Sequence, residues 1–272
     1  MDYRESSRPR APSNIADYFG RLSDTYGDGV YYGNRRSAVL DALADEIANA
    51  RDVLDVGCGN GAYLTKFVAA PGLRTVTGID LTFDMLLSAR NRVGAKCRLL
   101  RANVSQPPFK QDSFDFIFAS HVLQFIADAE LHGVVAEFVR CLQPGGVLIT
   151  TGQRDDGVRQ MLSEIVGPER WREYREVIFR RAARREADTR PKDRYQQAFA
   201  QAGLHVEERA APFTVTWPDI AEWIRIRWMP LIPAGERERA ESMIAELTQA
   251  AASQSVTQHE PLILGRRVKK LP

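Results

Sequence analysis

The chain has 272 residues, 44% of them hydrophobic, and 37 basic against 35 acidic residues give it a formal charge of +2. These values suit one well-buried α/β domain with an elaboration, and the near-neutral charge does not by itself indicate a nucleic-acid binder. No apolar run is long enough to span a membrane, and the charged N-terminus is not a signal sequence. Because Cys58, Cys97 and Cys141 are few and widely spaced, they suit a reducing cytosol, and a cytoplasmic protein is expected.

Strand and helix patterns alternate along the chain. After a leader of about 13 residues with a disordered composition, a helix is expected over 36 to 48. Strands are expected at 52 to 56, 74 to 79, 97 to 102, 114 to 119, 146 to 151, 205 to 215 and 261 to 268, and further helices at 61 to 69, 82 to 92, 130 to 141, 193 to 202 and 234 to 251. This alternation predicts an α/β fold with a doubly wound, mostly parallel seven-stranded sheet, whose ligands bind at the carboxyl ends of the strands.

A glycine-rich turn follows the first of these strands. Residues 57 to 62, Gly-Cys-Gly-Asn-Gly-Ala, formally match the G-x-G-x-x-G/A fingerprint of NAD-binding proteins, and Asp80 follows the second strand. However, Asp55 stands two residues before the first glycine, and a carboxylate there disfavours a pyrophosphate, which is already negative. The same carboxylate can steady the cationic amino acid end of S-adenosylmethionine. The turn therefore favours S-adenosylmethionine over NAD.

Five motifs in order make the chain resemble the class I S-adenosylmethionine-dependent methyltransferases. They are VLDVGCGNG at 53 to 61, GID at 78 to 80, RANVSQPPF at 101 to 109, SFDFIFASHVLQFI at 113 to 126 and LQPGGVLI at 142 to 149. The resemblance covers residues 37 to 151. One position departs from the family: Asn103 stands where an aspartate is frequent, so its side chain can form hydrogen bonds but carries no charge.

The resemblance implies which residues hold the cofactor. The glycine turn would hold the methionine moiety, Asp80 the ribose hydroxyls, and Leu81, Asn103 and Val104 the adenine. Cys58 is expected to pack beneath the cofactor and not to act as a nucleophile, because methyl transfer from a sulfonium needs no protein thiolate. The expected cofactor-binding residues are Asp55, Gly57, Cys58, Gly59, Asn60, Asp80, Leu81, Met85, Asn103, Val104, Ser120 and Tyr26.

The residues after the fourth strand are expected to face the methyl acceptor. His121 is the candidate general base, because a histidine side chain titrates near neutrality. Alternatively, His121 only lines the cofactor's edge or hydrogen-bonds the backbone, which leaves Ser120 and Gln124 as pocket residues. Phe125 belongs to the same expected lining. The other histidines have no partners at ligand spacing, so no metal site is predicted.

Two intervals after the fifth strand are longer than a core methyltransferase needs, and helical cap insertions are expected there. The arginines and glutamates of the first interval have the helical spacings of a salt-bridged surface, with anionic-substrate binding as the alternative. In the second interval, Trp223 and Arg227 are candidate acceptor residues, as is Tyr31 near the N-terminus. The alternative for the tryptophans is that they pack the cap onto the sheet.

The expected organisation has six parts. These are an N-terminal leader and cofactor lid at 1 to 35, a cofactor-binding core at 36 to 153, a cap insertion at 154 to 192, a core helix and strand at 193 to 216, a second insertion at 217 to 258, and a final strand and tail at 259 to 272. The lid follows from the resemblance, because an N-terminal segment often folds over the cofactor in this family. The tyrosines between 18 and 32 suit that role, and they suit an anchoring role on the core equally well.

The chain is therefore expected to be an S-adenosylmethionine-dependent methyltransferase, releasing S-adenosylhomocysteine. A small-molecule acceptor, anionic or aromatic, would displace the methyl group directly through an oxygen, nitrogen or carbon atom. Three alternatives stay open: an RNA or protein methyltransferase, suggested by the arginine-rich interval; an NAD-dependent oxidoreductase; and a non-catalytic module that binds S-adenosylhomocysteine. Neither a nucleic acid nor a membrane is the expected partner.

Overall fold

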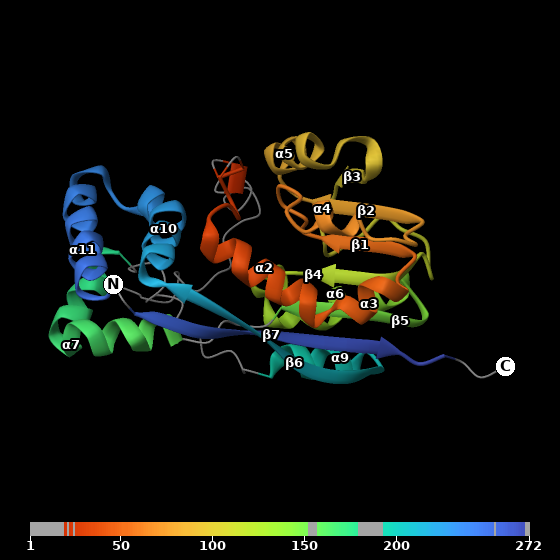
Figure 1. Ribbon diagram of the computed structural model, residues 1–272. Helices are drawn as coiled ribbons and strands as arrows, with labels where there is room; N and C mark the ends of the chain where they lie inside the picture. Colours follow the sequence, from red (N-terminus) through yellow and green to blue (C-terminus); the bar gives the residue numbers. More distant parts are fainter. Residues whose placement is uncertain are drawn as a thin grey trace, which may run out of the picture.

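The computed structural model describes residues 19–20, 22–23, 25–151, 157–178, 193–252 and 254–269, except for the side chains of 157–161, Arg227 and Leu231. At its centre lies a seven-stranded sheet in the order β3-β2-β1-β4-β5-β7-β6 (Figure 1). The strands are β1 Asp52–Val56, β2 Thr75–Asp80, β3 Arg98–Arg101, β4 Phe114–Ala119, β5 Leu142–Thr151, β6 Leu204–Thr216 and β7 Ser255–Arg267. The first five strands are parallel to one another, and β7 is antiparallel to both β5 and β6. The predicted fold class is confirmed.

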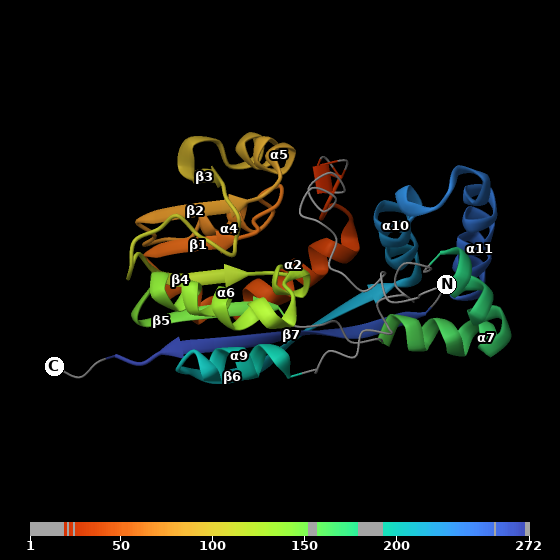
Figure 2. The ribbon, with the colours of Figure 1, turned by 180° about the vertical axis from the view of Figure 1, so that it is seen from behind.

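Helices cover both faces of this sheet (Figures 1 and 2). One face carries α2 Val30–Ala42, α3 Ala44–Asn49, α4 Leu64–Phe67 and α5 Phe83–Val93; the other carries α6 Asp128–Cys141 and α9 Arg194–Gln201. Val39 and Leu43, with Phe67 of α4, are buried against the first face, whereas Phe138 of α6 and Phe199 of α9 are buried against the second. Short 3-10 helices, Gly94–Lys96 and Leu123–Phe125, follow α5 and β4.

A second hydrophobic core lies beyond the sheet, around the far end of the β6–β7 hairpin. Only residues 262 to 266 of β7 pair with β5, so the rest of the hairpin projects past the carboxyl end of β5. Around this projection pack α7 Gly157–Val177, α10 Trp217–Arg227 and α11 Arg237–Ala250, which we call the helical unit (Figure 1). Two 3-10 helices, Met229–Leu231 and Ala234–Glu236, connect α10 to α11. Tyr174, Trp217 and Ile244 are almost fully buried there.

Some element boundaries differ from the sequence prediction. The helix expected to begin at 36 begins at Val30, because Gly33 is accommodated within the helix and Tyr31 and Tyr32 are buried. It is interrupted at Leu43, between α2 and α3. The final strand begins at 255 instead of 261, because its first residues pair with β6 in the projecting hairpin. Burial of apolar side chains in the second core outweighs the local signals on which the prediction depended.

The charged residues of the first interval bind one another where the structure describes them. Arg170 of α7 contacts Glu173 at 2.8 Å, and Glu173 contacts Arg239 of α11 at 2.5 Å. These exposed ion pairs form a salt-bridged surface between α7 and α11. The arginine-rich stretch 180 to 185 lies outside the described residues. Within the described part of the chain, none of the helices combines the length and the apolar character required to cross a membrane.

Glu46 of α3 links the helical layer to the last two strands. Its carboxylate accepts hydrogen bonds from Arg209 of β6 at 2.9 and 3.0 Å and also contacts Arg266 of β7. Burial raises the pKa of Glu46, but the hydrogen bonds from the two arginines outweigh burial, and the net pKa is lowered. A lowered pKa stabilises the folded chain at pH values above the unfolded pKa of about 4.3, and this stabilisation is lost as the pH falls through the folded-state pKa.

We therefore expect Glu46→Gln to lower the free energy of unfolding by about 2 kcal/mol at neutral pH, and by less below about pH 4. Urea unfolding at pH 7 and pH 3 measures both values. Glu207→Gln is the matched control, because Glu207 contacts the same arginine but is 39% exposed. The expectation would be contradicted if both variants lost the same free energy of unfolding at pH 7. It would also be contradicted if Glu46→Gln were destabilised relative to wild type as much at pH 3 as at pH 7.

Candidate active site

A cavity of about 870 Å³ lies at the carboxyl ends of the parallel strands β1, β2 and β4. Its walls come from the N-terminal segment, α2, the glycine turn after β1, the loops after β2, β3 and β4, and α6. Parallel strands expose their carboxyl ends at one edge of the sheet, which is where ligands of open α/β sheets bind. The helical unit contributes no lining residue within the described part of the chain.

The glycine turn forms one wall of this cavity. Gly57 and Gly59 have φ angles of 64° and 54°, in the left-handed region that favours glycine. A Cβ atom on Gly57 would lie 2.4 Å from Cγ2 of Val122, so the turn and the loop after β4 approach closely only because this side chain is missing. The turn therefore presents bare backbone to the cavity.

Two carboxylates flank the turn. Asp55 is 2% exposed, and its Oδ2 atom has no hydrogen-bond partner among the described residues. Asp80, at the end of β2, accepts hydrogen bonds from the backbone N–H groups of Gly59 at 2.9 Å and Thr82 at 2.8 Å. Burial, and then the neighbouring charge of Asp80, raises the pKa of Asp55 well above its usual range. The Asp55 carboxyl is thus suited to a cationic hydrogen-bond donor entering the cavity.

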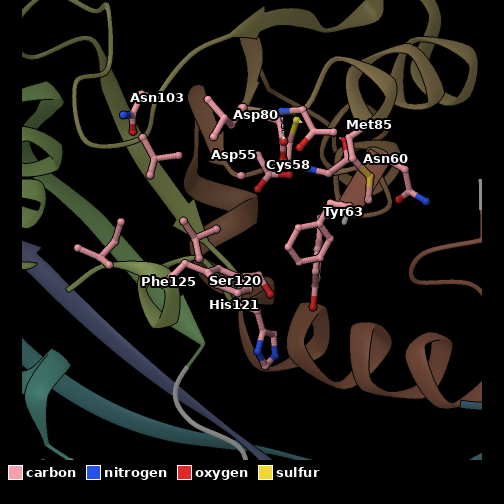
Figure 3. A pocket seen from close by; sticks show the side chains of 18 of the residues that line it. Asp55, Cys58, Asn60, Tyr63, Asp80, Met85, Asn103, Ser120, His121 and Phe125 are labelled. Atoms are coloured by element: carbon pink, nitrogen blue, oxygen red, sulfur yellow. Dashed lines mark hydrogen bonds between the residues drawn. The ribbon is translucent and has the colours of Figure 1, made fainter. Parts of the chain in front are cut away.

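Cys58 and Met85 lie behind and beside the turn (Figure 3). Cys58 is buried, and its backbone N–H donates to the carbonyl of Ile79 at 2.9 Å. Burial raises the pKa of the Cys58 thiol well above its usual range, with the charge of Asp55 next in importance. A thiol that stays protonated is a poor nucleophile, so the geometry favours a packing role for Cys58.

The N-terminal segment covers part of the cavity. The side-chain amide of Asn60 donates to the backbone carbonyls of Ser23, at 3.2 Å, and Tyr26, at 2.5 Å, which ties this segment to the glycine turn. Phe19 packs edge-to-face on Phe125 of the loop after β4, with ring centroids 5.6 Å apart. The described residues between 19 and 26 therefore contact both the glycine turn and the loop after β4.

His121 stands at the opposite side of the cavity from Asp80, with Ser120 beside it (Figure 3). Its Nε2 atom lies 2.8 Å from Oε1 of Glu260, a buried carboxylate of β7. The ring and hydroxyl of Tyr63 extend toward the same side, next to α2 (Figure 3). Sequence reasoning identified His121 but missed Glu260 and Tyr63.

The structure brings most of the expected site residues together, but not all. The cavity is lined by Tyr26, Asp55, Gly57, Cys58, Gly59, Asn60, Asp80, Leu81, Met85, Asn103, Val104, Ser120, His121 and Phe125. Gln124 is partly buried but does not line it. Tyr31 and Trp223 also lie elsewhere, because their rings stack on each other at 4.9 Å and 22° within the core of the helical unit. The side chain of Arg227 lies outside the described residues.

Two cations of α2 also line the cavity, and sequence reasoning missed both. Arg35 lies with its guanidinium 5.3 Å from the ring centre of Tyr32, and Arg36 donates to the carbonyl of Gly27 at 3.2 Å. The only feature of the sequence that could have pointed to them is that two arginines stand next to each other in the helix before the first strand. Among the described residues there is no group of three or more histidine, cysteine or acidic side chains arranged to hold a metal ion.

Comparison with known proteins identifies this arrangement. Residues 53–146 match the family model described as a methyltransferase domain. The malonyl-[acyl-carrier protein] O-methyltransferase of Hamiltonella defensa is 36% identical over 135 residues, which are 50% of each chain. The trans-aconitate 2-methyltransferase of Rhodopseudomonas palustris is 32% identical over 143 residues, 51% of this chain and 54% of that protein.

The match to these curated relatives extends over about half of their length. The solved structure of the [4+2]-cyclase SpnF superposes on this chain with a TM-score of 0.60 and 15% sequence identity. The match covers 95% of this chain and 97% of the SpnF chain, and it supports the fold. The family match and the relatives both fall on the strands and loops that build the cavity. The chain therefore contains a domain of the class I S-adenosylmethionine-dependent methyltransferases.

Proposed function

We propose that this chain is an S-adenosylmethionine-dependent methyltransferase that acts on a small-molecule acceptor. The observation that carries the proposal is the buried Asp55 carboxyl, whose Oδ2 atom receives no hydrogen bond from the described residues and lies beside a bare glycine turn. The ammonium group of S-adenosylmethionine would supply that donor and the opposite charge. A dinucleotide would instead bring a pyrophosphate to this carboxylate.

The remaining lining residues fit the other parts of the cofactor. Each Asp80 oxygen accepts one backbone hydrogen bond, and a carboxylate oxygen can accept a second one, here from a ribose hydroxyl. Leu81 and Val104 offer apolar surface for adenine, and the amide of Asn103 offers a hydrogen-bonding group. Arg36 would hold the methionine carboxylate, because its guanidinium lies next to Gly27, which in turn borders Ala62 of the turn.

The protein residues act mainly by orientation and exclusion of water. When bound, the cofactor supplies a methyl group on a sulfonium, which an acceptor displaces without protein nucleophiles. Tyr26, whose backbone carbonyl accepts from Asn60, covers part of the cavity, and Phe19 with Phe125 would close its acceptor side. Orientation of two reactants in a closed site contributes about 7–11 kcal/mol in favourable cases.

Because the pKa of Asp55 is raised, we expect the affinity for the cofactor to depend on pH. Below that pKa the free protein carries a proton on Asp55, whereas the bound ammonium favours the carboxylate, so binding releases the proton. We expect the affinity to rise with pH until Asp55 ionises, as long as the cofactor's α-amino group, with a pKa of about 7.7–8.0, stays charged.

Calorimetry in buffers of different ionisation enthalpy counts the protons released. Asp55→Asn is the matched variant, because its amide keeps the shape of the side chain but cannot release a proton. If the wild-type protein and this variant release the same number of protons, Asp55 does not bind the ammonium.

Titration calorimetry with S-adenosylhomocysteine and with NAD tests the proposed function itself. We expect one saturable site for S-adenosylhomocysteine and none for NAD. The salt dependence separates a small-molecule enzyme from one that binds RNA, because phosphate contacts make affinity fall steeply with salt. Binding of NAD without binding of S-adenosylhomocysteine would end the proposal.

A further inference from the structure

A partly buried polar cluster adjoins the acceptor side of the cavity. It consists of Arg35 of α2, Tyr63 after the glycine turn, His121 after β4 and Glu260 of β7. Glu260 stands two residues before Leu262, which pairs with Thr151 at the carboxyl end of β5, so the antiparallel strand carries its carboxylate to the edge where the cavity opens. The His121 and Glu260 side chains are only 12% and 2% exposed.

The Glu260 carboxylate lies against the His121 ring. Nε2 lies 2.8 Å from Oε1 of Glu260, although the two atoms are not aligned for a hydrogen bond among the described residues. We place the proton of the neutral ring on Nε2, toward this carboxylate, which leaves the lone pair on Nδ1. The backbone of His121 has a φ of 54°, a costly conformation for a residue with a side chain, and its N–H donates to Oγ1 of Thr151 at 2.9 Å. The fold therefore holds His121 in one place from both its backbone and its ring.

Arg35 gives the cluster a permanent positive charge. Burial lowers the pKa of Arg35, but Glu260 together with the neighbouring tyrosines outweighs burial, and the net pKa is raised. Its Nε atom is buried and has no hydrogen-bond partner among the described residues. Burial raises the pKa of Tyr63, so its hydroxyl stays protonated and can donate. With a neutral His121, the charges of Arg35 and Glu260 balance.

We propose that this cluster is the acceptor subsite, and that its acceptor is a planar molecule with an ionisable hydroxyl group, a phenol or an enol. This inference rests on the proposed function. A carboxylate acceptor is already ionised and needs no base, and it would add negative charge beside Glu260. An ammonium would be repelled by Arg35. The aromatic rings of Phe19, Tyr26, Tyr32 and Phe125 suit a flat acceptor.

The chemistry of the subsite is one proton transfer. The O–H bond of the acceptor breaks and the proton moves to Nδ1 of His121, while the electron pair stays on the oxygen. The resulting imidazolium faces Glu260 through Nε2, and the oxyanion lies beside Arg35. Two opposite charges thus appear next to two charges that the fold already holds. Bound S-adenosylmethionine would supply the methyl group that the oxyanion accepts, and its sulfur would keep the electron pair of the broken bond as a neutral thioether. Glu260 acts through His121 and is a positioning residue.

Spectrophotometric titration with 4-nitrophenol tests the subsite, because its phenol and phenolate forms absorb differently. The probe is added to the complex of the protein with S-adenosylhomocysteine. We expect saturable binding about tenfold tighter than that of 4-nitrobenzoate or 4-nitroaniline. We also expect the phenolate band at pH values where free 4-nitrophenol is mostly protonated. No saturable binding of 4-nitrophenol, or equal or tighter binding of either other probe, would overturn the acceptor class.

Variants assign the roles within the cluster. Glu260 contacts the His121 ring, and Tyr63 and Arg35 are the other titratable groups of the cluster, with the neutral hydroxyls of Ser120 and Thr151 nearby. Glu260→Gln should raise the pH at which the bound probe ionises by about one unit, because the amide no longer stabilises the imidazolium. Arg35→Met should weaken phenolate binding about tenfold. An unchanged ionisation pH in the first variant would remove Glu260 from the proposal, and unchanged binding in the second would remove Arg35.

Matched controls separate these roles from damage to the fold. Arg225 and Glu241 form an exposed pair at 2.9 Å on the helical unit, away from the cavity. Arg225→Met and Glu241→Gln should leave probe binding and its ionisation unchanged. Calorimetry with S-adenosylhomocysteine is run on every variant: if it binds and the probe does not, the acceptor proposal fails alone, and if the wild-type protein does not bind it, the proposed function fails.

Discussion

Replacing Asp80 with alanine is expected to weaken the binding of S-adenosylhomocysteine by about 2 kcal/mol or more, roughly thirtyfold. The Asp80 carboxylate is expected to stabilise the cofactor complex in two ways. It accepts the N–H groups of Gly59 and Thr82, which holds the glycine turn against the end of β2, and it offers its remaining lone pairs to the ribose hydroxyls. The variant loses both contributions, and it leaves two buried N–H groups without an acceptor.

Titration calorimetry measures the change in affinity, and thermal unfolding without ligand measures the damage to the turn. Asp45→Ala is the matched control, because Asp45 is an exposed carboxylate in the first turn of α3, away from the cavity. An Asp80→Ala variant with wild-type affinity would remove Asp80 from the cofactor site.

Replacing Trp223 with alanine is expected to lower the free energy of unfolding by about 3–5 kcal/mol. The ring is 5% exposed and stacks on Tyr31 of α2, so the substitution removes one of the contacts between the helical unit and the helix that precedes the sheet. Affinity for S-adenosylhomocysteine in the folded variant should stay within about twofold of wild type, because Trp223 does not line the cavity.

Urea unfolding checks this expectation, with Phe83→Ala as the control. Phe83 is a comparably large ring, but it is 61% exposed on α5, and its removal should change the stability by less than about 0.5 kcal/mol. If a stably folded Trp223→Ala variant no longer bound the 4-nitrophenol probe, Trp223 would have to be counted among the acceptor-binding residues, as the sequence suggested.

The core of the fold was predictable because its signals are local. The strands at 52 to 56 and 114 to 119 were predicted with the bounds that the structure shows, since their apolar runs are bounded by turn residues. The sixth strand was predicted almost at its full length, whereas the last strand was underestimated, because residues 255 to 260 are nearly all polar and become a strand only through pairing with β6.

The cofactor side of the cavity was predictable from motifs, whereas the acceptor side was not. Asp55 and Asp80 belong to the short stretches that resemble the family. Glu260 reaches His121 from an antiparallel strand near the end of the chain, and the charge of Arg35, in a helix before the first strand, interacts with that of Glu260. No periodicity or spacing links these positions, because only the sheet order β4-β5-β7 brings them together.

A crystal structure of the protein with S-adenosylhomocysteine tests the central claim most directly. We predict that the amino group lies within hydrogen-bond distance of Asp55, that the ribose hydroxyls lie within hydrogen-bond distance of Asp80, and that the sulfur faces the side of the cavity with His121. A ligand bound elsewhere, or one whose ribose makes no contact with Asp80, would contradict this account.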